Sequence, residues 1–326
     1  MSGARGWQQL AEVGSLGALR SMSWLYRRFG RPFARSVLFP VAAYFFLRHA
    51  YIRRASRDYL ETLARASGGG TGPVGSRRVF RHVLEFAVQI FDRMVSWGDS
   101  FDRIEMEKSG SIALLELARS GRGGILVGAH LGSFDLLRLV ADRYDVRVNV
   151  LMYTANADRI NEFFARLDPR SHVRVLPIDP DSAQTAFSVR RCVEQGEFVG
   201  ILADRVPPGG RGRAERVQFL GREATFQTAP FELATLLGCP LLFCLCLRTG
   251  DARYEAIAKT LHAGGRVPPG LRAERARELL GAYVAELEAA CRRAPEQWFN
   301  FFDYWPPQTG PGPARSEPQV SGVEMG

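Results

Sequence analysis

The sequence lacks a hydrophobic run long enough to cross a bilayer. Its most apolar segment is residues 37–47. As a helix this segment would rise roughly 16 Å, whereas a bilayer has a hydrocarbon core of about 30 Å. Residues 1–19 also lack a basic stretch that leads into an apolar core. We therefore expect neither a spanning helix at residues 37–47 nor a cleaved signal peptide.

Acidic residues are missing between positions 13 and 57, where arginine is frequent. The arginines of this region are Arg20, Arg27, Arg28, Arg31, Arg35, Arg48, Arg53, Arg54 and Arg57. Trp24, Tyr26 and Tyr51 flank the apolar segment. Arginines and aromatic rings around a short apolar helix favour a position at the interface of a membrane, on its cytoplasmic face. A buried helix of the folded domain is the alternative.

Cysteine is scarce and its pattern is uninformative for metal binding. The five cysteines are Cys192, Cys239, Cys244, Cys246 and Cys291. Their number is odd, their spacing matches no zinc motif, and three of them lie in or beside an apolar run. We expect reduced thiols in the core of a cytosolic domain, with no bound metal.

Several catalytic motifs are also absent. There is no Gly-x-Ser-x-Gly elbow, no phosphate-binding Gly-x-x-x-x-Gly-Lys-Ser/Thr loop and no Gly-x-Gly-x-x-Gly turn. These absences argue against a serine hydrolase and against nucleotide-dependent enzymes. The net charge of +9, from 43 Lys and Arg against 34 Asp and Glu, suits an anionic partner. No nucleic-acid recognition motif accompanies this charge, so a membrane surface is the expected partner and nucleic acid is not.

What is present is an alternation of helices and apolar strands typical of an α/β protein. Strands are expected near residues 125–127, 147–152, 173–177, 198–203, 241–247, 254–259 and 298–302. They predict a mainly parallel central sheet flanked by helices, preceded by an N-terminal membrane-associated helical segment. We divide the chain into an anchoring segment (1–66), a glycine-rich linker (67–76), an enzyme domain (77–308) and a disordered tail (309–326).

The segment 124–135 carries the first candidate site. An apolar strand ends in a tight turn with small residues, and His130 follows at the carboxyl end of the strand. Open α/β sheets bind their ligands at this end. Asp135 lies within a predicted helix over residues 134–140, where it could orient the imidazole and leave the other ring nitrogen free to accept a proton. The alternative is a structural histidine beside a solvated acid.

Residues 200–205 form a second strand end, where an apolar run stops at Asp204 and Arg205. If both strands end at one crevice, Arg205 could bind a phosphate or stabilise charge on a thioester oxygen, with Asp204 holding the arginine. A structural ion pair is the alternative. Arg222 is a further candidate for a phosphate, although a surface arginine could have the same pattern. We assign Gly132 and Ser133 to substrate binding as well.

These blocks resemble the lysophospholipid acyltransferase superfamily, in particular its lipid A lauroyl and myristoyl transferases. The resemblance rests on Gly-Ala-His-Leu-Gly-Ser-Phe-Asp, Gly-Ile-Leu-Ala-Asp-Arg, Phe-Leu-Gly-Arg-Glu-Ala and Pro-Glu-Gln-Trp-Phe-Asn-Phe, in that order. It covers most of residues 24–305. Relatives near lipid A synthesis usually have Glu at the position of Asp135. The ending Trp-Phe-Asn-Phe-Phe-Asp-Tyr-Trp is closer to relatives in aryl polyene pathways.

The resemblance implies a glycerolipid acyltransferase-like fold at the cytoplasmic face of the bacterial inner membrane. His130 would be the general base, and Asp135 would orient it. The donor would be an acyl carrier protein or coenzyme A thioester, and the acceptor a hydroxyl or amine of a lipid or glycolipid. No bound cofactor is implied. A non-catalytic lipid-binding protein of the same fold and a membrane-bound glycosyltransferase are the alternative functions.

Overall fold

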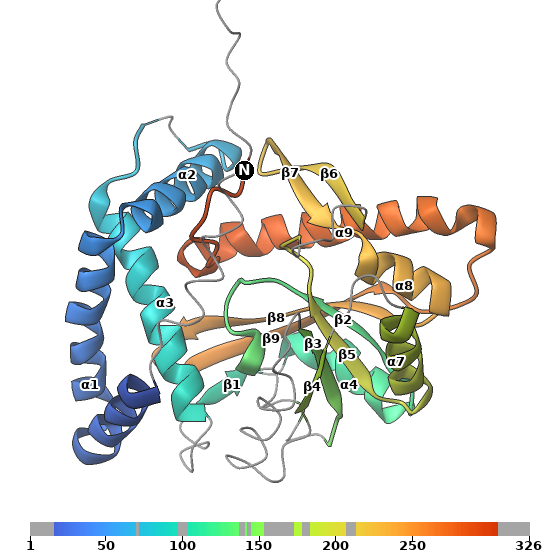
Figure 1. Cartoon of the computed structure of the whole chain (residues 1–326), viewed down its shortest axis with the longest axis horizontal. Coiled ribbons are helices and arrows are strands. Elements are labelled where there is room, and N and C mark those ends of the chain that lie inside the picture. Colours follow the sequence, from blue (N-terminus) through green and yellow to red (C-terminus); the bar gives the residue numbers. More distant parts are fainter. Residues whose placement is uncertain are drawn as a thin grey trace, which may run out of the picture.

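A computed structural model describes residues 16–69, 72–96, 104–107, 109–136, 141, 145–152, 173–177, 183–206 and 213–305. Its centre is a seven-stranded sheet with the order β1-β9-β8-β2-β5-β3-β4 (Figure 1). The strands are β1 (Glu105–Glu107), β2 (Gly124–Gly128), β3 (Val148–Met152), β4 (Val173–Pro177), β5 (Phe198–Leu202), β8 (Leu241–Gly250) and β9 (Arg253–His262).

The sheet is mainly parallel, as the sequence predicts. Strands β8, β2, β5, β3 and β4 run in one direction. Strand β9 is antiparallel to β8, and the short β1 pairs in parallel with β9. The described residues also include a separate hairpin of β6 (Ala214–Phe219) and β7 (Arg222–Gln227).

Helices cover both faces of the sheet because its central strands are apolar on both sides. Ile125 and Val127 belong to a core shared with α7 (Ala183–Glu194), α8 (Ala229–Leu237) and α9 (Arg272–Arg293). Leu126, between them, points into a second core shared with α4 (Ile112–Arg119). This alternation follows from the two-residue period of a strand, and burial on both faces explains the uninterrupted apolar run.

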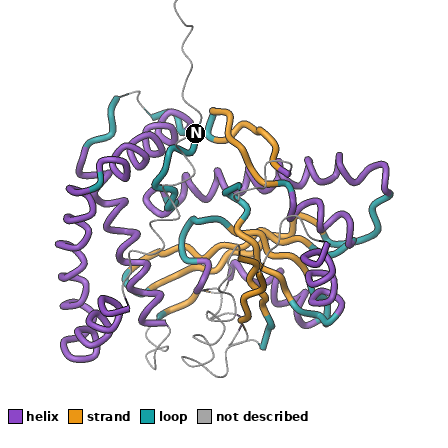
Figure 2. The backbone as a smooth tube through the Cα atoms, viewed as in Figure 1, coloured by secondary structure: helices purple, strands orange, loops and turns teal. Residues whose placement is uncertain are grey.

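Three helices precede the sheet and lie at its side (Figures 1 and 2). They are α1 (Leu16–Arg48), α2 (Ala50–Ala66) and α3 (Ser76–Ser96). Helix α1 is kinked at Gly30, where φ is 78°, and it packs on α3 through rings such as Tyr26 and Phe91. Within the described residues, none of the helices combines the length and the apolar character needed to traverse a bilayer.

One local prediction is wrong, one element was not predicted, and one predicted helix lies partly outside the described residues. Residues 298–302 form no strand of the sheet, because Trp298 makes only an isolated bridge to Leu131. The β6–β7 hairpin was not expected, since polar residues interrupt its apolar pattern. After His130 the chain makes a 3₁₀ turn at Phe134–Leu136, and residues 137–140 of the predicted helix lie outside the described part of the chain.

Candidate active site

His130 and Asp204 come together because they follow neighbouring parallel strands. Strands β2 and β5 pair with Gly128 opposite Leu202, the last residues of the two strands. His130 lies two residues after Gly128, and Asp204 lies two residues after Leu202. The imidazole Nδ1 of His130 is 2.8 Å from Oδ1 of Asp204. The backbone N–H of His130 donates to the other carboxylate oxygen, Oδ2, at 3.0 Å. One carboxylate therefore fixes both the backbone and the ring of His130.

Two residues of the carboxyl-terminal segment complete the hydrogen bonding of Asp204. The indole Nε1–H of Trp298 donates to Oδ2 at 3.1 Å, and the Nδ2–H of Asn300 donates to the same atom at 2.9 Å. Burial opposes ionisation of Asp204. The His130 charge and hydrogen bond, Arg205 and Asn300 more than offset this penalty, so the pKa of Asp204 lies below its usual range. The carboxylate is therefore ionised at neutral pH.

The arrangement gives His130 the tautomer and charge of a base. An ionised carboxylate only accepts hydrogen bonds, so Nδ1 carries the proton and Nε2 keeps its lone pair. The side chain of His130 is 29% exposed, which leaves the ring accessible. Burial lowers the pKa of His130, Asp204 opposes this shift, and the charges of Arg205 and Arg93 add to it. The imidazole is consequently neutral at pH 7.

Arg205 lies in the same cluster, next to Asp204. Its Nε–H donates to Oδ1 of Asn300 at 2.6 Å, and Nη2 donates to the carbonyl of Phe299 at 3.0 Å. Because arginine only donates, it turns the amide of Asn300 so that Nδ2 faces Asp204. The Asp204 carboxylate hydrogen-bonds to His130, and its charge also interacts favourably with the charge of Arg205.

The loop after β2 is shaped by two close approaches. The ring of Phe134 lies over Gly128 and Gly200 on adjacent strands, where a Cβ would come within 2.5 Å and 3.0 Å of it. At Gly132 φ is +69°, and a Cβ would lie 2.2 Å from the carbonyl oxygen of Cys246. The N–H of Ser133 donates to this same carbonyl at 2.8 Å. The glycines therefore allow the loop after β2 to lie directly against the backbone of β2, β5 and β8.

Of the other predicted site residues, none is seen to contact His130 among the described side chains. The side chain of Asp135 lies outside the described part of the structure, so its orienting role stays a prediction. Arg222 on β7 bonds to Asp58 at 2.7 Å and Thr62 at 3.0 Å, and it stacks over Trp305. These contacts join β7 to α2. Ser133 is buried, and its Oγ has no hydrogen-bond partner among the described residues.

The sequence analysis missed Trp298 and Asn300 as residues of the site. Both lie in an aromatic stretch that packing alone explains, since Trp298 contacts the rings of Tyr59, Phe219 and Tyr304. The one available signal was Asn300, a polar residue inside an otherwise aromatic run. A buried amide needs partners, and here they are Asp204 and Arg205.

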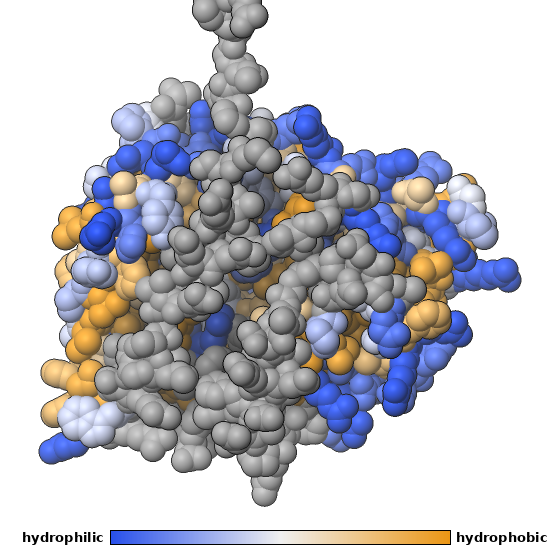
Figure 3. All heavy atoms as spheres, in the orientation of Figure 1, coloured by the Kyte–Doolittle hydropathy of each residue, from blue (hydrophilic) through white to orange (hydrophobic). Residues whose placement is uncertain are grey.

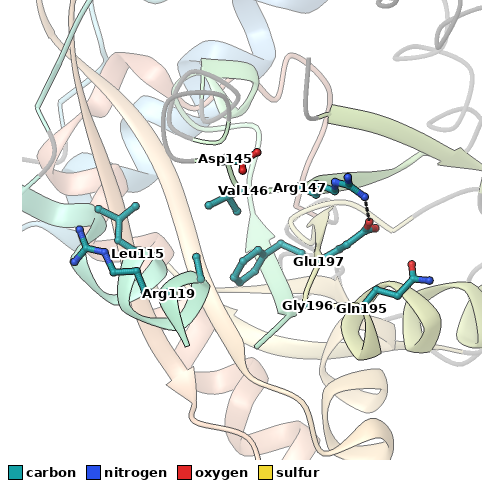
Figure 4. A pocket seen from close by; sticks show the side chains of 10 residues that line it. Leu115, Arg119, Asp145, Val146, Arg147, Gln195, Gly196 and Glu197 are labelled. Carbon is teal, nitrogen blue, oxygen red and sulfur yellow. Dashed lines mark hydrogen bonds and ion pairs between the residues drawn. The ribbon is translucent and has the colours of Figure 1, made fainter. Parts of the chain in front are cut away.

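A pocket of about 540 Å³ lies away from this cluster (Figure 4). It is lined by residues of α4 such as Leu115, by Val146 and Arg147 just before β3, and by Glu197 and Phe198 where β5 begins. The pocket therefore lies at the amino ends of these strands, opposite His130. Arg147 and Glu197 form an ion pair of 3.3 Å within it. The described residues contain no cluster of three or more His, Cys, Asp or Glu suited to a metal ion.

Fold and site together define a class: a mainly parallel α/β protein that presents a carboxylate-bound imidazole at the carboxyl ends of its strands. Residues 83–306 match the bacterial lipid A biosynthesis acyltransferases, and the chain belongs to this family. The protein is thus an acyltransferase, from a family that uses acyl thioester donors. The matched residues include His130, Asp204 and Trp298. A search of curated proteins found no match to the chain.

Proposed function

We propose that this protein transfers a fatty or polyene acyl group from an acyl carrier protein or coenzyme A thioester to a lipid or glycolipid. The acceptor group is a hydroxyl or an amine, and His130 is the general base. The observation that carries the proposal is the 2.8 Å contact between His130 Nδ1 and Asp204. It supports a neutral imidazole with a free lone pair at Nε2, beside strand ends where α/β proteins bind ligands.

The reaction then follows from ordinary acyl transfer. Nε2 of His130 removes the proton of the acceptor hydroxyl as its oxygen attacks the thioester carbonyl carbon. The C–O bond forms, and the carbonyl electrons move onto the oxygen. When this tetrahedral species collapses, the C–S bond breaks and the thiol leaves with the proton held by the imidazolium. Asp204 stabilises that imidazolium while the proton is on the ring.

Arg205 supports the proposal through its charge. The guanidinium belongs to the same cluster, and its charge lowers the pKa of His130. Positive charge beside the reacting centre also stabilises the negative oxygen of the tetrahedral species. Substrate contacts by Gly132, Ser133 and Arg222 remain predictions. The contacts of Arg222 with Asp58 and Thr62 favour a structural role for that residue.

We further propose that α1 rests on the cytoplasmic face of the bacterial inner membrane. Ala34, Leu38 and Ala42 form its buried face. Tyr44 and Leu47, on the opposite face, are 61% and 73% exposed. Figure 3 shows hydrophobic side chains gathered along the side of the molecule that α1 forms. An exposed apolar face with nearby arginines is suited to the interface of an anionic bilayer.

The test is acyl transfer by membranes that contain the protein. Membranes are incubated with radiolabelled palmitoyl-acyl carrier protein or palmitoyl-coenzyme A, and the extracted lipids are compared with those from His130→Ala membranes. We expect labelled lipid with one donor, and at least ~100-fold less with the variant, as for loss of a general base. Activity of His130→Ala within a few-fold of wild type would remove His130 from the mechanism. Lipid binding without transfer would favour the lipid-binding alternative, and transfer from a sugar nucleotide the glycosyltransferase.

A further inference from the structure

Helix α3 carries a row of polar side chains that faces into the protein. Its members, three or four residues apart, lie on one side of the helix. The pairs are Arg78 with Glu296, His82 with Trp298, Glu85 with Arg248, Gln89 with Gln297, and Asp92 with Tyr254. A polar helix face normally meets water. The polar face of α3 instead forms hydrogen bonds and ion pairs with the segment 296–298 and with strands β8 and β9.

His82 is the member of this row that faces Trp298. It is fully buried, and its Nε2 lies 3.0 Å from the carbonyl oxygen of Trp298. Its Nδ1 lies 2.8 Å from Oγ of Ser56, on α2. A carbonyl oxygen only accepts, so Nε2 must carry the proton and Nδ1 must accept from the Ser56 hydroxyl. Both ring nitrogens of the neutral imidazole are thereby satisfied.

Trp298 connects this histidine to the site. While its carbonyl accepts from His82, its indole Nε1–H donates to Asp204. The next residue, Phe299, donates its N–H to the carbonyl of His130 at 2.7 Å. Trp298 also bridges to Leu131. A displacement of the Trp298 backbone would therefore be felt by the carboxylate and by the loop that carries the base.

We propose that His82 is a positioning residue of the reaction, which acts through Trp298 to hold Asp204 against His130. Its N–H fixes the Trp298 carbonyl, and the indole then points its own N–H at Asp204. Ser56 keeps the ring in the tautomer that this requires. The inference concerns the site of the proposed function, and it ties helices α2 and α3 to that site.

The surroundings of His82 keep its ring neutral, so the donor is constant around neutral pH. Tyr59 from α2 and the rings of Phe299 and Phe301 pack around it. Arg78, on its own helix, is the charged group that acts on it. Burial and, to a smaller extent, the charge of Arg78 lower the pKa of His82 to about 4, against the opposing effect of the hydrogen bond to the Trp298 carbonyl.

The test measures the pKa of His130 and needs no acyl transfer. Diethyl pyrocarbonate reacts with neutral imidazole, so the pH midpoint of modification at His130, followed by peptide mass spectrometry on the full chain, reports this pKa. Asp204→Asn provides the calibration, because Asp204 raises the pKa of His130 against burial, Arg205 and Arg93. Its midpoint should fall by about 0.5 unit or more, a threefold change in proton affinity.

His82→Phe fills the same space without the donor, whereas His82→Gln keeps an N–H that can reach the Trp298 carbonyl. We expect the midpoint of His82→Phe to fall toward that of Asp204→Asn, and that of His82→Gln to stay near wild type. Tyr254→Phe is the matched control. It removes another buried hydrogen bond of α3, at 2.7 Å to Asp92, and should leave the midpoint unchanged.

A folded His82→Phe with the wild-type midpoint would overturn the inference. Equal shifts in His82→Phe and His82→Gln would also overturn it, because packing rather than the hydrogen bond would then be responsible. Should His82→Phe fail to fold, Ser56→Ala decides. Loss of the Ser56 hydroxyl frees the tautomer and should lower the midpoint by a smaller amount, whereas an unchanged midpoint contradicts the role. Failure of acyl transfer with any donor would affect the proposed function and leave this measurement intact.

Discussion

At the residue scale, the site depends on which carboxylate faces the imidazole. The sequence offers Asp135, five residues after His130, and Asp204, which lies beyond another strand. The structure places Asp204 Oδ1 at 2.8 Å from Nδ1 of the ring. A spacing of five residues is visible in a sequence, whereas contact between residues 74 positions apart arises only when β2 and β5 pair in register.

This difference gives a direct comparison of two substitutions. Asp204→Asn should reduce acyl transfer by about 100-fold or more, because an amide can donate to Nδ1 and so stabilise the wrong tautomer. Asp135→Asn should cost less. Initial rates with the labelled donor, measured on variants with wild-type unfolding midpoints, check the order. If Asp135→Asn were the more damaging change, Asp135 would be the residue that orients the base.

His82 gives a prediction about the pH dependence of stability. Its pKa in the folded protein is about 4, lowered mainly by burial, against an ordinary value of 6.5. Between these values the unfolded chain binds a proton that the native protein does not, so the native state loses stability as the pH falls. The loss attributable to His82 should reach about 3 kcal/mol below pH 4.

The measurement is the free energy of unfolding at a series of pH values for wild type and His82→Phe. The wild type should lose stability more steeply than the variant between about pH 6.5 and pH 4, because phenylalanine does not titrate. His130 is present in both proteins, and a fall of about 0.5 unit in its pKa in the variant would change its contribution by about 0.7 kcal/mol, well below the effect expected for His82. Parallel curves would show that His82 is already protonated, or solvated, in the folded state.

At the element scale, the apolar runs predicted the strands well because both faces of the sheet are covered. The runs at residues 125–127, 198–203 and 241–247 all became strands of the parallel core. The run at residues 298–302 was misjudged for the same reason, since burial alone makes a segment apolar. Trp298 and Phe299 are buried against the loop after His130, so they support the site without extending the sheet.

The turn after β2 provides a prediction at this scale. Gly132 has φ of +69°, and a Cβ there would lie 2.2 Å from the backbone oxygen of Cys246. Gly121 has nearly the same φ, +70°, with nothing within 4 Å of the added atom. Gly121→Ala should therefore cost only the left-handed backbone penalty of about 1–2 kcal/mol.

Gly132→Ala adds a collision with rigid backbone to the same penalty. It should destabilise the protein by at least ~2 kcal/mol more than Gly121→Ala and abolish acyl transfer by displacing His130. Denaturant unfolding of the two variants isolates the collision, because the backbone term is common to both. Equal destabilisation would mean that the loop moves away from β8 at little cost.

At the scale of the whole molecule, the N-terminal helices have two roles. They pack on the rest of the folded protein, and α1 also presents an exposed apolar side. Tyr59, Leu60 and Leu63 of α2 belong to the main hydrophobic core. The sequence shows the arginines of this region and predicts that it is helical. The division of α1 into a buried and an exposed face, however, emerges only from its packing on α3. Arg28 and Arg48 are exposed along the same helix.

If α1 rests on a bilayer, charges on its exposed face should release the protein. Tyr44→Glu combined with Leu47→Glu removes two apolar side chains, each worth about 1.5–3 kcal/mol when fully buried, and adds repulsion from anionic lipid. Binding to vesicles containing phosphatidylglycerol, measured by sedimentation, should fall at least ~10-fold.

The paired control is Leu236→Glu with Leu271→Glu, at residues that are 50% and 53% exposed on other helical elements. High salt should weaken wild-type binding only in part, because it screens the arginines and leaves apolar burial intact. Equal binding of the two double variants would show that the exposed side of α1 is not the surface that meets the membrane.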